Sequence, residues 1–408
     1  MITSHDRHIL RELARRVAEI AHLPIMSERR ELWKRHNRLD PVRPMILVFP
    51  EGSWRELLPA TALQCEGETA RTMEWTLRSR LYHHAHLHDD TVIEGRWVVH
   101  KRVTVSGWGL EARHKPSTEE TGAWAFDPVI KTREDLRKLR LPEVTCDEAN
   151  SARDLEEAQE LFGDLLDVVQ KGVAHISFHL MSVYSGLRGL EQTLMDMVDE
   201  PDMLHEAMGF LTEGYERLVQ QYVELNLLSL NNDETYHSSG GVGYSIELPK
   251  SDYLPECVRP CDLWASAESQ ELDVVSRAMH AEFALQYERR LLAPFGLTGY
   301  GCCDRLDNKL EDVMAIPNMR RISIAPFAKV DKCAPQLGGR YIFSWKPHPA
   351  HLVGPFDADY VRRYIRRTLD VCREHGCVLE MILKDTHTCE NHPERFTQWT
   401  DLARALVD

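Results

Sequence analysis

Short apolar runs alternate with amphipathic stretches along most of this chain. Eight runs are short and rich in branched or aromatic residues, as buried strands are: residues 45–49, 173–180, 225–230, 261–265, 295–300, 321–325, 340–345 and 378–383. The longer stretches between them place apolar residues at helical spacing, as in 189–223, 274–290, 306–314 and 358–375. Regular alternation of strand and helix predicts a parallel sheet, and eight such units are what a closed (β/α)8 TIM barrel requires. An open doubly wound α/β sheet is the alternative.

Two regions fall outside this rhythm. Residues 5–35 place Ile9, Leu10, Leu13 and Val17 at helical spacing, which predicts a helical extension over residues 1–40. Residues 55–170 alternate irregularly, with helix predicted over 68–83 and 151–171 and strand over 96–105. We interpret 55–170 as a long insertion after the first strand that covers one barrel face. Barrels with insertions reach this length, so we predict one domain over residues 1–408.

The composition narrows the class of partner. The 408 residues include 49 Lys and Arg against 64 Asp and Glu, a formal charge of -15, which argues against nucleic acid. No run approaches the roughly 20 apolar residues of a membrane span, and the first residues lack the order of a secretory signal. The 10 cysteines of such a long chain indicate reduced thiols. A cytoplasmic protein without membrane contact is expected.

Chemically reactive side chains follow the predicted strands, where barrel enzymes place their active sites. In chain order these are Glu51, Trp54, His179, Tyr184, Glu234, Tyr236, Glu271, Cys302, Cys303, Asp304, Trp345, His348, His387 and Cys389. A purely structural barrel would favour Gly, Pro, Ser and Asn at such turns. The excess of Cys, His and carboxylates therefore indicates an enzyme.

Thiols and an imidazole follow two strands that could converge on one soft metal. Cys302 and Cys303 are adjacent, and His387 and Cys389 are two residues apart, so on an extended segment they face the same side. Zinc accepts such ligands. Other interpretations remain open: one adjacent thiol could pack in the core, and His387 could cap the following helix. For the Gly240–Gly243 run, which lacks a phosphate-loop pattern, a plain flexible loop is favoured.

Several of these segments together resemble the uroporphyrinogen decarboxylase superfamily, which includes the zinc-dependent corrinoid methyltransferases. The matching segments are Tyr300-Gly-Cys-Cys303, Cys389-Glu-Asn-His-Pro-Glu-Arg395, Trp345–Leu352 and Gly189–His205. The resemblance implies a zinc ion at the barrel mouth and a corrinoid (cobalamin) carried by a separate protein. Two departures stand out: Tyr300 replaces the family's metal histidine and Cys303 its glycine. The decarboxylases' pair of arginines is reduced to Arg55, beside the acidic Glu51.

The resemblance and the residues together predict a zinc-dependent methyltransferase. It would move a methyl group between a small substrate, as donor or acceptor, and the corrinoid. The expected metal ligands are drawn from Cys302, Cys303, His387 and Cys389, and the expected acids and bases are Glu234, Glu271 and Asp304. The pocket would be lined by Glu51, Trp54, His179, Tyr184, Tyr236, Trp345 and His348.

Two alternatives belong to other classes. One is a metal-free decarboxylase or lyase with His387 as its acid, and the other is a non-catalytic binding barrel. The chain could also form a homodimer.

Overall fold

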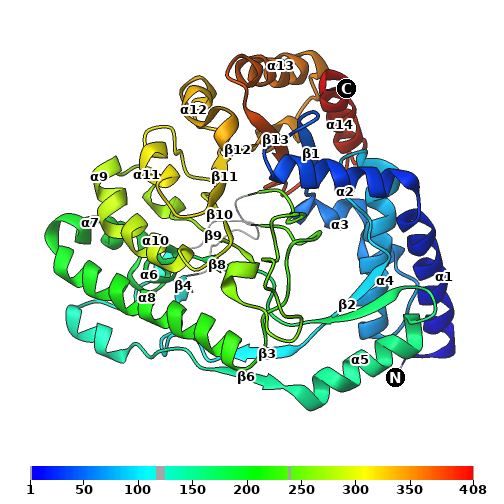
Figure 1. Cartoon of the computed structure of the whole chain (residues 1–408), viewed down its shortest axis with the longest axis horizontal. Coiled ribbons are helices and arrows are strands. Elements are labelled where there is room, and N and C mark those ends of the chain that lie inside the picture. Colours follow the sequence, from blue (N-terminus) through cyan, green and yellow to red (C-terminus); the bar gives the residue numbers. More distant parts are fainter. Residues whose placement is uncertain (1, 116–124, 238–239, 408) are drawn as a thin grey trace.

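A seven-stranded parallel sheet forms the centre of the molecule, whose computed structural model describes residues 2–115, 125–237 and 240–407. The strand order is β1-β13-β12-β11-β10-β9-β8, and Figure 1 shows these strands along an arc with helices outside it. The bounds are β1 Met45–Val48, β8 Ser177–Phe178, β9 Trp264–Ala267, β10 Leu297–Tyr300, β11 Met319–Ile324, β12 Ile342–Trp345 and β13 Val378–Leu383. The predicted parallel α/β sheet is confirmed.

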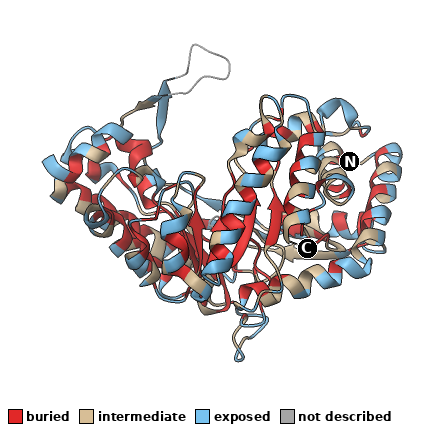
Figure 2. Ribbon diagram, turned by 90° about the horizontal axis from the view of Figure 1, so that it is seen from above, coloured by how far each residue is buried: buried red, intermediate tan, exposed pale blue. Residues whose placement is uncertain are grey.

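Side chains alternate along these strands between an apolar outer face and a polar inner face. In β11, Ile322 and Ile324 belong to the main hydrophobic core, whereas Arg321 and Ser323 occupy the alternate positions. The same period recurs in β12 and β13, because successive strand residues point to opposite faces. The outer face packs on helices, and Figure 2 shows buried residues concentrated in the strands and on the helix faces toward them. The polar positions therefore line the concave side of the arc.

The helices alternate with the strands much as predicted. Their bounds are α1 Ser4–Ala21, α2 Pro24–Asn37, α3 Trp54–Leu57, α4 Glu68–Tyr82, α5 Glu148–Phe162, α6 Leu180–Arg188, α7 Leu190–Asp199, α8 Pro201–Glu224, α9 Arg277–His280, α10 Gln286–Leu292, α11 Leu310–Met314, α12 Val330–Leu337, α13 Ala358–Glu374 and α14 Glu394–Val407. Helix α12 is absent from the sequence-based prediction. None of the helices in the described ranges combines the length and the apolar character needed to cross a membrane.

The predicted third strand, residues 225–230, does not join the sheet, and this prediction is wrong. Only an isolated parallel bridge links Leu228 to Val173, and β8 pairs directly with β9. The side-chain amide of Asn231 then donates to the carbonyls of Ala174 and Trp264, at 2.8 and 2.9 Å, in place of a backbone ladder. The polar run that follows turns away from the sheet because Asp233 accepts hydrogen bonds from Thr235 two residues on.

Backbone pairing does not close the arc within the part of the chain that the structure describes. The free edge of β1 is covered by two carboxylates instead of a strand: Ile46 N donates to Asp90 at 2.8 Å and Val48 N to Asp89 at 2.9 Å. The fold is therefore TIM-barrel-like, with seven strands in its ladder where a closed eight-stranded barrel was predicted.

The Gly240–Gly243 run lies against the concave face of the sheet, so the plain flexible loop favoured from the sequence gives way to a packed segment. An antiparallel bridge joins Tyr236 to Val242. Gly240 and Gly241 have φ of 117° and 65°, a region that L side chains rarely adopt. A Cβ on Gly241 would overlap the Arg321 guanidinium, and one on Gly240 would lie 2.7 Å from Lys346 Nζ. Only glycine fits this approach to the polar strand positions.

The predicted insertion forms a set of small sheets beside the arc. Strand β2 (Arg96–His100) pairs in parallel with β7 (Asp167–Lys171), β3 (Arg102–Val105) with β6 (Val144–Asp147), and β4 (Arg113–Lys115) with β5 (Ala125–Asp127). The helix predicted over 151–171 ends at Phe162, because residues 167–171 gain a strand partner in β2. Residues 116–124 of the insertion lie outside the described residues.

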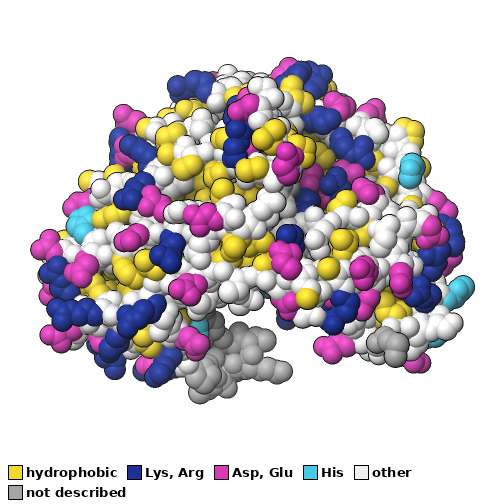
Figure 3. Space-filling model, turned by 60° about the horizontal axis from the view of Figure 1, so that its bottom comes forward, with side chains coloured by type: hydrophobic (Ala, Val, Ile, Leu, Met, Phe, Trp, Pro, Cys, Tyr) yellow, Lys and Arg dark blue, Asp and Glu magenta, His cyan; other side chains and the backbone are white. Residues whose placement is uncertain are grey.

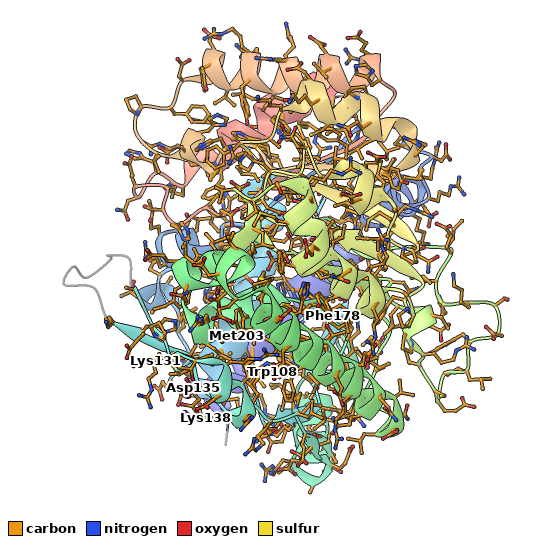
Figure 4. All side chains as sticks on the ribbon, turned by 90° about the vertical axis from the view of Figure 1, so that its left-hand side faces the viewer. Trp108, Lys131, Asp135, Lys138, Phe178 and Met203 are labelled. Carbon is orange, nitrogen blue, oxygen red and sulfur yellow. The ribbon has the colours of Figure 1, made fainter. Side chains whose placement is uncertain are left out.

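Helix α8 connects this insertion to the sheet. Its Tyr215 ring lies 5.2 Å from the Trp108 ring of the insertion and 5.5 Å from the Phe178 ring of β8. Figure 4 shows Trp108 and Phe178 beside this helix.

Candidate active site at the carboxyl ends of the strands

Five ionisable side chains follow the carboxyl ends of the strands, four at the inner, polar positions and Cys302 on the turn made by Gly301. They are His179 after β8, Glu268 after β9, Cys302 after β10, Lys346 after β12 and Lys384 after β13. Cys302 is close enough to Lys384, Glu268 and Lys346 for their charges to act on its ionisation. The carboxyl ends of parallel strands meet at one edge of a sheet, which is where such folds place their chemistry.

A sharp turn after β10 presents Cys302. Gly301 has φ of 90°, and a Cβ there would approach the Leu306 side chain to 2.7 Å. The backbone of Cys302 is then held on both sides: its N–H donates to Asp304 at 3.0 Å, and its carbonyl accepts from the Ser323 hydroxyl at 2.8 Å. Asp304 is fully buried, and burial raises the pKa of its carboxyl to about 6. The predicted catalytic acid thus lies beneath the thiol and positions it.

The Cys302 thiol faces a second thiol and an ammonium group. Its Sγ lies 3.7 Å from Cys303 Sγ and 3.8 Å from Lys384 Nζ. The hydrogen bond from Cys303, and then the Lys384 charge, lower the pKa of Cys302 to about 7. Cys303, which also lies 3.7 Å from an oxygen of Asp385, has its pKa raised. Cys302 is therefore the thiol that ionises near neutral pH, and a thiolate is the reactive form of cysteine.

A histidine and a glutamate form a close pair across from this thiol. His179 Nδ1 lies 2.6 Å from Glu268 Oε1, and the other Glu268 oxygen accepts from Gln270 N at 2.9 Å. Burial opposes a charge on His179, but the Glu268 carboxylate outweighs it and raises the pKa of the imidazole. Glu271, in the short helix η6 (Gln270–Leu272), has its pKa raised to about 7 by burial and by Glu268.

A buried ionic network lies deeper on the inner face. Arg321 of β11 forms an ion pair of 3.0 Å with Glu380 of β13, whose second oxygen lies 3.1 Å from His36 Nε2 of α2. Lys346 donates to the Ser344 hydroxyl at 2.8 Å, and burial lowers the pKa of its ammonium to about 7. Sequence reasoning missed Arg321, Glu380 and His36. Charged residues at alternate positions of otherwise apolar runs were the signal that could have identified them.

Two left-handed residues join β1 to β13 at the mouth. The Glu51 carboxylate accepts from Asp385 N at 2.7 Å, and their φ values are 44° and 59°. Such strain outside glycine persists where the surroundings hold it, often at functional sites. The half-buried Tyr236 ring lies 4.6 Å from Phe49, and its buried hydroxyl has no hydrogen-bond partner among the described residues. The charges of Lys384 and Cys302 both act on this hydroxyl.

Other predicted site residues lie apart from this group. Trp54 packs with Trp75 and Tyr82, both ring pairs at 5.6 Å, between α3 and α4. Tyr184 donates to Asp196 in the core, and Trp345 packs on Tyr364 of α13 at 5.1 Å.

Two further predicted site residues, Glu234 and His348, also lie apart from this group. Glu234 forms an ion pair with Arg96 of β2 at 3.4 Å. His348 stands on the loop after β12, where its ring lies 5.3 Å from Phe327.

The four predicted zinc ligands do not gather into one set. Cys389 is fully buried and its thiol donates to Glu56 at 3.0 Å, while His387 is exposed beside Gly52. Among the described residues, no group of three or more His, Cys, Asp or Glu side chains could hold a metal ion. Cys302 and Cys303 alone could supply two thiolates, fewer than the three protein ligands usual for catalytic zinc. The residues present therefore do not fit the predicted zinc centre.

Comparison with known proteins supports the fold. No family model and no curated protein sequence matches this chain. Among solved structures, a methyltransferase from Methanosarcina mazei is similar with a TM-score of 0.51 and 13% sequence identity, over 92% of this chain and 97% of that one. At this identity the likeness shows a shared TIM-barrel-like architecture over nearly the whole chain.

Proposed function

We propose that this chain is a methyltransferase that moves a methyl group between a small substrate and a corrinoid carried by a separate protein. The contact between Cys302 and Lys384 at the mouth is the observation that carries the proposal, because it places an ionisable soft nucleophile where this architecture performs chemistry. The fold shared with a methyltransferase, and the motif resemblance over 300–303 and 389–395, support the same assignment.

Methyl transfer is a short reaction, in which the protein has to position the reacting atoms and place charge beside them. The methyl carbon passes in line between two nucleophilic atoms, so both must be held close and shielded from water. Lys384 places positive charge at the mouth, and His179 with Glu268 can exchange a proton with the bound substrate. The hydroxyl of Tyr236 is within range of the same charges and has no hydrogen-bond partner among the described residues.

The corrinoid would supply the cobalt atom that gives up or accepts the methyl group. The mouth must then be open to a large partner, and Figure 3 shows one face on which charged side chains of both signs border a recess. Zinc dependence stays a prediction from the sequence. The four expected ligands are not assembled into one set.

Methyl exchange tests the proposal directly. Incubation with methylcobalamin and a small thiol should convert the corrinoid spectrum to that of the demethylated form, and Cys302→Ser should lower the rate strongly. A protein that exchanges no methyl with any corrinoid, free or carried, would turn attention to the decarboxylase or lyase alternative. That alternative is weakened by Arg55, whose guanidinium donates to the His387 carbonyl at 3.1 Å and is not part of a carboxylate clamp.

A further inference from the structure

Glu268 holds His179 in one orientation at the mouth. The Glu268 side chain is 3% exposed and accepts from both His179 Nδ1 and Gln270 N, so its position is determined from two sides. The His179 side chain is 37% exposed. With Nδ1 engaged by the carboxylate, Nε2 is the ring atom left for a ligand, and it has no hydrogen-bond partner among the described residues. An imidazole fixed by a buried carboxylate is the usual arrangement for proton transfer.

The groups around His179 are those that a proton-transfer residue needs. Glu268 faces it from the end of β9, Glu271 from η6 and Cys302 from the turn after β10, and Tyr215 of α8 bonds to its backbone. Three acidic groups of this kind stabilise a positive imidazolium once a proton has been taken up. The ring can therefore accept a proton from a bound substrate and return it in the reverse direction.

We propose that His179 is the proton-transfer residue of this site, with Glu268 as its positioning carboxylate, and that the methyl-exchanging substrate carries a proton on its reacting atom. This inference rests on the proposed function. In the forward step Nε2 removes the proton from the substrate's X–H group as X bonds to the methyl carbon. The carbon–cobalt bond breaks, and its electron pair stays on cobalt. Thiols and alcohols are substrates of this kind, and quaternary ammonium ions are not.

The positions of the aromatic side chains point to the same substrate class. Quaternary ammonium ligands are recognised by cages of aromatic rings. Of the four aromatic residues that the sequence suggested for the substrate pocket, Tyr236 lies at the mouth. Trp54, Tyr184 and Trp345 pack against Trp75, beside Asp196 and against Tyr364, so these four do not form a cage. A protic substrate needs a base, and the mouth supplies one.

The test compares two thiols that differ in their need for a base. Methylcobalamin is the methyl donor, and 2-mercaptoethanol, protonated at pH 7, is compared with thiophenol, which is largely ionised there. His179→Asn should slow methyl transfer to 2-mercaptoethanol by about 100-fold, the lower end of the range for a general base, and transfer to thiophenol by less than about threefold. Glu268→Gln should show the same selective loss to a smaller degree. His175→Asn, on the same strand face but bonded to the Tyr236 carbonyl, should leave both rates unchanged.

Each outcome decides a different claim. An equal loss with both thiols in His179→Asn would overturn the proton-transfer role and leave the methyltransferase proposal standing. No methyl exchange by the wild-type protein with any corrinoid, free or carried, would overturn the proposed function and this inference with it. If His179→Asn does not fold, Glu268→Gln decides the matter alone, since a purely structural carboxylate would affect both thiols alike.

Discussion

The thiol of Cys302 lies 3.8 Å from the ammonium of Lys384, although 82 residues separate them in the chain. They follow strands β10 and β13, which do not pair with each other, and they meet at the carboxyl end of the sheet, Lys384 at an inner position and Cys302 on the turn made by Gly301. The hydrogen bond from Cys303 and then the Lys384 charge lower the pKa of Cys302, so it is the more reactive of the two adjacent cysteines.

Removing the Lys384 charge should make Cys302 less reactive at neutral pH. The ammonium favours the thiolate, so Lys384→Met should raise the pKa of Cys302 from about 7 toward the ordinary thiol value. Alkylation of Cys302 by iodoacetamide at pH 7 should slow by roughly tenfold, whereas the rate at pH 10 should hardly change. Lys384→Arg keeps the charge and serves as the control. Equal alkylation at pH 7 in wild type and Lys384→Met would show that the lysine does not act on the thiol.

The buried thiol of Cys389 gives a test of the zinc hypothesis. Burial, and then the hydrogen bond to Glu56, raise the pKa of Cys389 to about 12, which disfavours the thiolate that zinc requires. Any zinc found by elemental analysis should therefore survive Cys389→Ser and fall in Cys302→Ser. Loss of zinc in Cys389→Ser alone, with the fold intact by circular dichroism, would restore Cys389 to the ligand set.

The packing of Gly241 predicts that alanine substitution destabilises the protein more there than at Gly354, a glycine with the same φ. Gly241 and Gly354 both have φ of 65°, but only Gly241 would bring a Cβ against Arg321 and Glu380, while Gly354 has nothing within 4 Å. Gly354→Ala should cost about 1–2 kcal/mol from the left-handed backbone alone, and Gly241→Ala distinctly more. Urea unfolding of both variants measures this. Equal losses would mean that the loop does not pack into the concave face.

The buried carboxylate of Glu380 predicts how stability depends on pH. Burial alone would raise its pKa, but Arg321 and His36 hold the pKa to about 2, below the ordinary value of 4.5. The pair's contribution is thus fully present above pH 4.5 and is lost as the pH falls toward 2. Glu380→Gln should lower the free energy of unfolding by about 3–5 kcal/mol at pH 7, because Arg321 keeps a buried charge without its partner.

The acid limb of the stability curve gives a second readout for Glu380, since it should flatten in Glu380→Gln between pH 4.5 and 2. Glu311→Gln breaks an exposed pair with Arg277 and should cost no more than about 1 kcal/mol. A variant of Glu380 that is as stable as wild type at pH 7 would exclude the ion pair as a stabilising contact.

Much of the fold could be predicted from local pattern, and the exceptions have identifiable causes. Seven of the eight expected runs contribute strands to the sheet, because a buried parallel strand is a short apolar run wherever it lies. The run at 225–230 has the same apolar pattern but does not join the sheet. The side-chain amide of Asn231 donates to the carbonyls of Ala174 and Trp264 in place of a backbone ladder. The sequence predicts helix for residues 167–171 because their pairing partner, β2, lies about 70 residues earlier in the chain, outside any local window.

The candidate site, like the fold, could be predicted from the sequence only in part. The residue types, and their places after predicted strands, identified Cys302, His179 and Glu271 as candidate site residues from the sequence alone. Both are local properties of the chain. Which of them act together was decided only by tertiary structure. Charges act over a few ångströms. Lys384 therefore acts on Cys302, and Glu268 on His179, through distances in space that the spacing along the sequence does not give. For the same reason Cys389, alike in type and pattern, is bonded to Glu56 and takes no part in the group around Cys302.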